Sequence, residues 1–308
     1  MELKQASNGD INLFIWREGH EYFRQKSKVF LKEFTTLIFD LRPQPPASPM
    51  IYHDLTKGLP FPDASFDHVN CYHVYEHLNF HEADILTREI RRVLKPGGIY
   101  RASTPNMEMI AAEYLKNLES CLDQETEANL KRYRWIVMKL IEQGIRDKTG
   151  GLMLETMQQG GFDRRYVRDV FGEAHDSFFD IKPQAQEAPP AGPALKRSLL
   201  KKVFSLNQQK IKNKINDLKY RKQLARYQNG IGADMRTNRE TVTLLPDRLY
   251  LQLNFERNGF TDFTVRDYKT SLIRDWDKYK LDQSNNGEYA YDPSLYVEAR
   301  KEGGPDGN

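Results

Sequence analysis

Cysteine is scarce in this sequence of 308 residues, which holds only Cys71 and Cys121. Two cysteines are too few for a disulfide framework or a cysteine-rich zinc site, so we interpret each as a small core residue. Long apolar runs are missing as well, since no stretch approaches the roughly 18 uncharged apolar residues of a membrane span. Because no apolar signal region follows the first residues, we expect a cytoplasmic location.

Acidic residues are nearly absent between residues 195 and 228, where eleven basic side chains accompany a single acid, Asp217. The net charge of this segment is +10 and that of the whole chain is +3, which leaves a net charge of −7 for the remainder. Its apolar residues are spaced for an amphipathic helix. Such a helix can bind an anionic membrane surface at the inner face of the membrane, or lie solvated beside the rest of the fold. Nucleic acid is not an expected partner, because aromatic side chains do not interleave with the basic ones.

Apolar runs with strand character alternate with a helical pattern over the first third of the chain. The helical pattern consists of Ile85, Leu86, Ile90, Val93 and Leu94, and we expect Lys95-Pro96-Gly97-Gly98 to end the helix. Alternating strands and helices imply βαβ units, and therefore an α/β fold with a parallel sheet. The predicted strands are 11–16, 36–39, 50–52, 66–72 and 99–103.

The sequence predicts four parts. Residues 1–106 form the first part of the core, and residues 107–244 form a helical insertion or lid. The insertion contains a proline-rich linker over 183–193 and the basic segment described above. Residues 245–302 complete the core, and 303–308 are expected to be a disordered tail.

Short motifs stand in a fixed order along the predicted core. They are His53-Asp54-Leu55, Leu59-Pro60-Phe61, Ser65-Phe66-Asp67, Glu76-His77-Leu78, the run Glu89 to Gly98, Asn258 to Thr261, and Ser294 to Ala299. In order and spacing they resemble the class I S-adenosylmethionine-dependent methyltransferases, and most closely a bacterial branch associated with surface-polysaccharide synthesis. The resemblance implies a Rossmann-like fold with a mostly parallel seven-stranded sheet, an antiparallel last strand and a helical insertion.

The same resemblance implies S-adenosylmethionine as the cofactor and assigns residues to it. Asp40 ends the second strand, where the family places the acid that binds the ribose hydroxyls. Asp54 and Leu55 follow the third strand, where an acid can meet the adenine amino group, and His73 is expected around the same crevice. Ordinary strand-end or turn positions are the alternative interpretation of Asp40 and Asp54.

The glycine-rich loop that normally follows the first strand in this family is missing. Phe14-Ile15-Trp16 stands where its Gly-x-Gly belongs, and after Gly19 no glycine follows until Gly58. Glycine serves there because the backbone must approach the cofactor closely and adopt positive φ. Two alternatives follow: Phe14 and Trp16 fill the cofactor's space, or they point away and leave it open.

A general base is needed for methyl transfer to a sugar hydroxyl, and His77 is the candidate that the motif Glu76-His77-Leu78 offers. No metal is expected, because alternation along a strand sends neighbouring histidines to opposite faces. One hypothesis is an O-methyltransferase that acts on a glycan or lipid-linked sugar. The other is a degenerate pseudo-methyltransferase that serves as a binding or scaffolding module.

Overall fold

The computed structural model describes residues 3–17, 32–40, 44–46, 48–145, 151–172, 175, 179, 216–219, 221–222, 241–281 and 294–303. The predicted linker over 183–193, most of the basic segment 195–228 and the tail beyond residue 303 lie outside this description. Among the described residues no helix is long and apolar enough to cross a membrane.

Seven strands form one sheet in the order β3-β2-β1-β4-β5-β7-β6. The first five are parallel to one another, and β7 is antiparallel to both of its neighbours. The sheet therefore confirms the predicted Rossmann-like α/β fold, mostly parallel with an antiparallel last strand. The strands are β1 (Asn12–Arg17), β2 (Thr35–Phe39), β3 (Ile51–His53), β4 (Phe66–Tyr72), β5 (Leu94–Pro105), β6 (Phe260–Arg266) and β7 (Ser294–Lys301).

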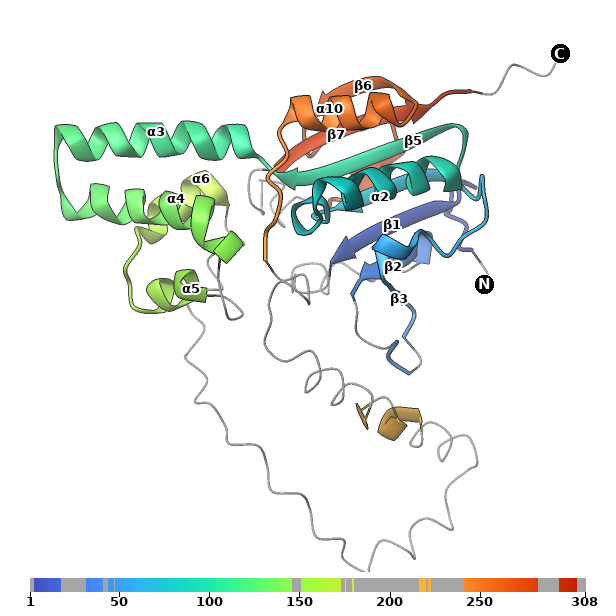
Figure 1. Cartoon of the computed structure of the whole chain (residues 1–308), viewed down its shortest axis with the longest axis horizontal. Coiled ribbons are helices and arrows are strands. Elements are labelled where there is room, and N and C mark those ends of the chain that lie inside the picture. Colours follow the sequence, from blue (N-terminus) through green and yellow to red (C-terminus); the bar gives the residue numbers. More distant parts are fainter. Residues whose placement is uncertain are drawn as a thin grey trace, which may run out of the picture.

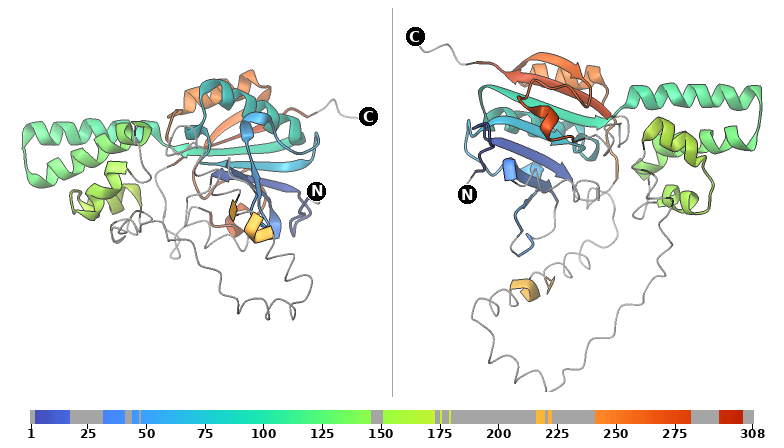
Figure 2. Two further views of the ribbon diagram at one scale, coloured as in Figure 1. Left: turned by 60° about the horizontal axis from the view of Figure 1, so that its bottom comes forward. Right: turned by 180° about the vertical axis from the view of Figure 1, so that it is seen from behind.

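Alternation along β1 divides the core between the two faces of the sheet. Leu13 and Ile15 face the larger cluster, where α2 (Phe80–Val93) and α10 (Arg248–Arg257) pack. Phe14 and Trp16 face a second, aromatic-rich cluster, closed by residues 273–281 and the short helix η5 (Trp276–Lys278). Figures 1 and 2 show α2 and α10 over one side of the sheet and η5 over the other.

Helix α2 begins at a capping box, in which the Asn79 side chain accepts from the Glu82 N–H and Glu82 accepts from the Asn79 N–H. Its residues Leu86, Ile90 and Val93 are buried at helical spacing, as predicted. The strand that follows begins earlier than expected, at Leu94, because Leu94 already pairs with Phe66, ahead of a register shift between Phe66 and His68 in the pairing of β4 with β5.

The residues after β5 form a helical arm. Figure 1 shows α3 to α6 projecting beyond the sheet on the side to which the arrowheads of β1 and β5 point. This arm has its own core around Trp135 and Phe171. The helices are α3 (Met107–Asp123), α4 (Glu127–Ile145), α5 (Gly151–Gln158) and α6 (Arg164–Phe171).

Candidate functional site

The carboxyl ends of the parallel strands form the edge of the sheet where α/β proteins bind ligands. Asp40 follows β2, Asp54 follows β3, His73 follows β4 and Asn106 follows β5. The first residue of the antiparallel β7, Ser294, pairs with Pro105 at the end of β5 and so lies at the same edge. The helical arm leaves the sheet here as well, because α3 begins directly after Asn106.

His73 is the best-defined polar group of this edge. Its backbone has φ 48°, an uncommon conformation outside glycine, and its N–H donates to Ser103 O at 3.0 Å. The buried imidazole uses both nitrogens: Nδ1 lies 2.9 Å from Glu76 Oε1, and Nε2 lies 2.8 Å from Ser294 Oγ. Because a carboxylate only accepts hydrogen bonds, Nδ1 is the donor, and in the neutral ring Nε2 accepts from the serine hydroxyl.

Glu76 orients this histidine from the turn η2 (Tyr75–His77). It is buried, and its second oxygen, Oε2, has no hydrogen-bond partner in the part of the chain that the structure describes. The sequence motif contains Glu76, but Ser294, the other partner of His73, lies 221 positions after His73 in the chain. The motif Ser294 to Ala299 locates a strand, but only the fold brings Ser294 to His73 and Glu76.

His77, predicted as the general base, is directed elsewhere. Its ring is buried, and Nδ1 donates to the carbonyl oxygen of Thr241 at 3.2 Å. The carbonyl of Glu76 accepts from the Thr243 and Leu244 N–H groups beside it. This contact attaches the chain that leads into α10 to the turn after β4.

The acids predicted to bind the cofactor differ in their surroundings. Asp40 is partly exposed at the end of β2, where its N–H donates to His53 O. Asp54 caps the short helix η1 (Leu55–Lys57): Oδ1 accepts from the N–H and hydroxyl of Thr56, and Oδ2 lies 3.3 Å from Lys57 Nζ. Burial alone would raise the pKa of Asp54, but the bonds from Thr56 and Lys57 outweigh it and lower that pKa. Leu55 places its side chain in the larger core cluster.

Phe14 and Trp16 lie within β1, so they do not form the turn that follows the strand. Phe14 pairs with Thr36 and Asn70, and Trp16 with Ile38 and Tyr72, in regular parallel register. The interpretation that Phe14-Ile15-Trp16 replaces the loop itself is therefore corrected: strand pairing on both sides holds these residues extended. β1 ends at Arg17, and Gly19 belongs to residues 18–31, which lie outside the described ranges.

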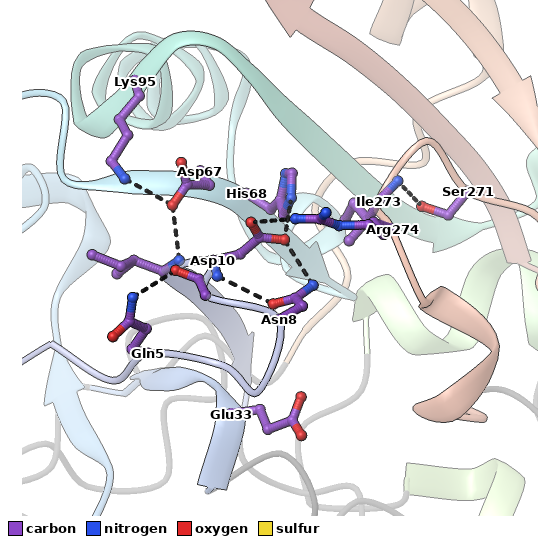
Figure 3. A network of polar contacts seen from close by, with 12 residues as sticks. Gln5, Asn8, Asp10, Glu33, Asp67, His68, Lys95, Ser271, Ile273 and Arg274 are labelled. Atoms are coloured by element: carbon purple, nitrogen blue, oxygen red, sulfur yellow. Dashed lines mark hydrogen bonds and ion pairs between the residues drawn. The ribbon is translucent and has the colours of Figure 1, made fainter.

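A second polar cluster lies at the opposite, amino edge of the sheet, around a cavity of about 300 Å³ (Figure 3). Its charges are largely paired with one another. Lys95 Nζ lies 2.8 Å from Asp67 Oδ2, while His68 and Arg274 each lie 3.3 Å from Asp10. Burial lowers the pKa of His68, against the opposing effect of Asp10. These pairs tie the start of β4 to β5 and to Asp10, two residues before β1, and tie Asp10 to Arg274, and we interpret the cluster as structural.

Metal ligands do not cluster among the described residues: no three histidine, cysteine, aspartate or glutamate side chains lie close enough to hold an ion. The histidines near β3 and β4 have separate partners. His53 contacts Gly58 O, His68 contacts Asp10, and His73 contacts Glu76 and Ser294.

The sequence pattern of the family described as "Methyltransferase domain" matches residues 37–102, from within β2 to within β5. This segment contains Asp40, Asp54, His73 and Glu76. Over these residues the chain is similar to methyltransferase domains. No curated protein matches the chain.

Three solved structures illustrate how distant its structural likenesses are. A methyltransferase of Haloferax volcanii in complex with the Trm112 methyltransferase activator is 10% identical, with 98% of this chain and 85% of that chain covered and a TM-score of 0.35. An S-adenosylmethionine-dependent methyltransferase of Methanosarcina mazei is 11% identical, covering 94% and 93%, with a TM-score of 0.36. One from Archaeoglobus fulgidus is 10% identical, covering 95% and 87%, with a TM-score of 0.38.

Proposed function

We propose that this chain is an S-adenosylmethionine-dependent O-methyltransferase that acts on a hydroxyl group of a glycan or lipid-linked sugar. The observation that carries the proposal is the His73–Glu76 pair at the carboxyl end of β4, inside the segment that matches the methyltransferase domain. An imidazole that accepts from one hydroxyl group, that of Ser294, has the geometry to accept a proton from another.

The fit of the cofactor rests on Asp40. A carboxylate at the end of β2, partly exposed at the ligand-binding edge, suits the two ribose hydroxyl groups. Asp54 suits the adenine amino group less well, because Thr56 and Lys57 already engage its carboxylate, and Leu55 can contribute only backbone. S-adenosylmethionine supplies the electrophilic methyl group when it is bound.

We assign the general base to His73 rather than to His77. Glu76 holds Nδ1–H of His73, which leaves Nε2 as the proton acceptor and stabilises the positive charge that the ring gains. His77 stays a candidate of second rank, since it is buried against Thr241. For His73 to act, the acceptor hydroxyl has to bind beside or in place of the Ser294 hydroxyl.

Methyl transfer can be measured with tritiated S-adenosylmethionine and the glycan and lipid-linked sugar fractions of the source organism. We expect label in one of these fractions and at least about a hundredfold less of it with His73→Ala, as for loss of a general base. His81→Ala, which changes an exposed histidine on α2, serves as the control. Transfer that His73→Ala leaves unchanged would rule out the assigned base.

A pseudo-methyltransferase is the second candidate, and specific observations favour it. The carboxylate of Asp54 is engaged in a helix cap, and the 14 residues after β1 contain a single glycine, Gly19. On this alternative the edge binds neither S-adenosylmethionine nor its demethylated product, and the domain serves as a binding or scaffolding module.

The basic segment 195–228 supports a proposal about location. Its charge of +10 suits the anionic inner face of a membrane, where a lipid-linked sugar would be found. We expect salt-sensitive binding to vesicles containing phosphatidylglycerol and none to neutral phosphatidylcholine vesicles. A variant with Lys201, Lys202, Lys210 and Lys214 changed to Glu should lose this binding, and equal binding by it would contradict the proposal.

A further inference from the structure

Ser294, His73 and Glu76 form a continuous hydrogen-bonded chain. The distances are 2.8 Å from Ser294 Oγ to His73 Nε2 and 2.9 Å from His73 Nδ1 to Glu76 Oε1. A hydroxyl beside an imidazole whose other nitrogen is bound to a carboxylate is the arrangement that activates serine as a nucleophile. Methyl transfer has no use for a protein hydroxyl at this position, so the proposed function leaves Ser294 unexplained.

Hydrogen bonds and strand pairing of the backbone fix the position of each residue in this hydrogen-bonded series. The N–H of His73 is bonded to Ser103 O, and the N–H of His77 to Val74 O, which sets the turn that carries Glu76. Ser294 is the first residue of β7 and is held by its pairing with Pro105. The positive φ of His73 turns the ring at the very end of β4 toward that strand. A nucleophile supported by strands keeps the geometry that its reaction needs.

The electrostatics of the chain favour proton transfer from the serine. Glu76 is buried, and within the described ranges its carboxylate has side-chain hydrogen bonding only through Oε1, to His73. A buried carboxylate interacts strongly with the nearest group that can become positive, and here that group is the imidazole. Ser294 itself is only half-buried.

We infer that Ser294 is a nucleophilic serine that accepts acyl groups from carboxylic esters, an activity separate from methyl transfer. Ser294 Oγ attacks the ester carbonyl carbon while its proton passes to His73 Nε2. The bond between the acyl carbon and the alcohol oxygen then breaks, and the alcohol leaves with the proton from His73. A water molecule next attacks the acyl carbon and gives one proton to His73 Nε2. The bond between the acyl carbon and Ser294 Oγ then breaks, Oγ takes that proton from His73, and the carboxylic acid is released with the serine restored. Glu76 is a positioning residue in both halves.

A fluorophosphonate probe tests this inference without any cofactor or known substrate. The serine oxygen bonds to phosphorus, fluoride leaves, and His73 takes the proton, so the product is a phosphonylated serine that peptide mass spectrometry locates. We expect label on Ser294 of the wild-type chain and none on that peptide in Ser294→Ala. His73→Gln should react at least about a hundredfold more slowly.

The rate of labelling shows whether Glu76 positions His73 or only stabilises the fold. Glu76→Gln should slow labelling, Glu76→Asp should recover part of the rate, and both should keep the wild-type circular dichroism spectrum. Ser120→Ala, in α3, is the matched control and should be labelled as the wild type is.

Absence of label on Ser294 in the wild-type chain overturns the inference whatever the variants do. Labelling that His73→Gln leaves unchanged overturns the triad. Because the probe needs no S-adenosylmethionine, these outcomes are independent of the methyl-transfer test.

Discussion

Arg101 and Glu298 form an ion pair that is closed off from solvent, with Arg101 Nη1 2.8 Å from Glu298 Oε1 and side-chain exposures of 1% and 0%. Arg101 also donates to the carbonyls of Asp267 and Thr270 and lies 4.4 Å from the centre of the Trp276 ring. The pair therefore joins β5 and β7 to the segment that covers Phe14 and Trp16. It therefore stabilises the packing of this segment against the aromatic-rich cluster on that face of the sheet.

Breaking this pair should destabilise the protein strongly. Arg101→Met leaves Glu298 as a buried carboxylate without its main counter-charge, so we expect the free energy of unfolding to fall by about 3–5 kcal/mol. Urea denaturation followed by circular dichroism measures the change. Arg165→Met serves as the control, because its pair with Asp169 is exposed and should contribute less than about 1 kcal/mol. Equal stability of the two variants would contradict this role of Arg101.

Acid should destabilise the fold through carboxylates whose pKa is held low. Arg92 lowers the pKa of Glu89 against the effect of burial, and the Leu59 N–H adds to it. For Asp67, burial acts to raise the pKa, but the hydrogen bonds from Lys95 and the Ile11 N–H outweigh burial, so the pKa of Asp67 is lowered. A carboxyl group whose pKa is lower in the folded state stabilises that state at any pH above the group's unfolded pKa of about 4. This contribution is lost as the pH falls through the folded pKa.

The measurement is the free energy of unfolding between neutral pH and pH 3. We expect a decline that starts near the unfolded pKa of about 4 and steepens below it. Glu89→Gln should show a shallower decline than the wild-type chain, because one of the titrating groups has been removed. A decline of the same steepness would show that Glu89 does not contribute.

Phe14 tests whether the aromatic residues of β1 obstruct a ligand. Its ring centre lies 6.1 Å from those of Phe34 and Tyr72 in the aromatic cluster. Phe14→Ala should therefore lower the free energy of unfolding by about 3–5 kcal/mol, as for other buried phenylalanines. It should leave the affinity for S-adenosylhomocysteine unchanged within a factor of about two. A tenfold gain in affinity would instead support obstruction of the cofactor's space.

Much of the sheet follows from local sequence. Short runs of residues with strand character predict β1 and β4, and the spacing of Leu86, Ile90 and Val93 predicts α2. The start of β5 at Leu94 was not predictable, because it depends on pairing with Phe66. For Asp54, the alternative interpretation as a turn position agrees with the structure, in which its side chain caps η1.

The candidate site was less predictable than the fold. His73 stands at a strand end that the motifs locate, but its partner Ser294 belongs to a strand 221 residues later. A contact of that kind depends on the sheet order β4-β5-β7, which no short pattern contains. For the same reason the motif drew attention to His77, whose imidazole contacts Thr241.

Isothermal titration calorimetry with S-adenosylhomocysteine tests the central claim, that the carboxyl edge binds the methyltransferase cofactor. We predict a dissociation constant below roughly ten micromolar, and at least about tenfold weaker binding by Asp40→Ala, because a charged hydrogen bond to the ribose is lost. Asp169→Ala, on the exposed side of α6, should bind as the wild-type chain does. Absence of binding by the wild-type chain, or equal affinity of Asp40→Ala, would contradict the claim and favour the pseudo-methyltransferase.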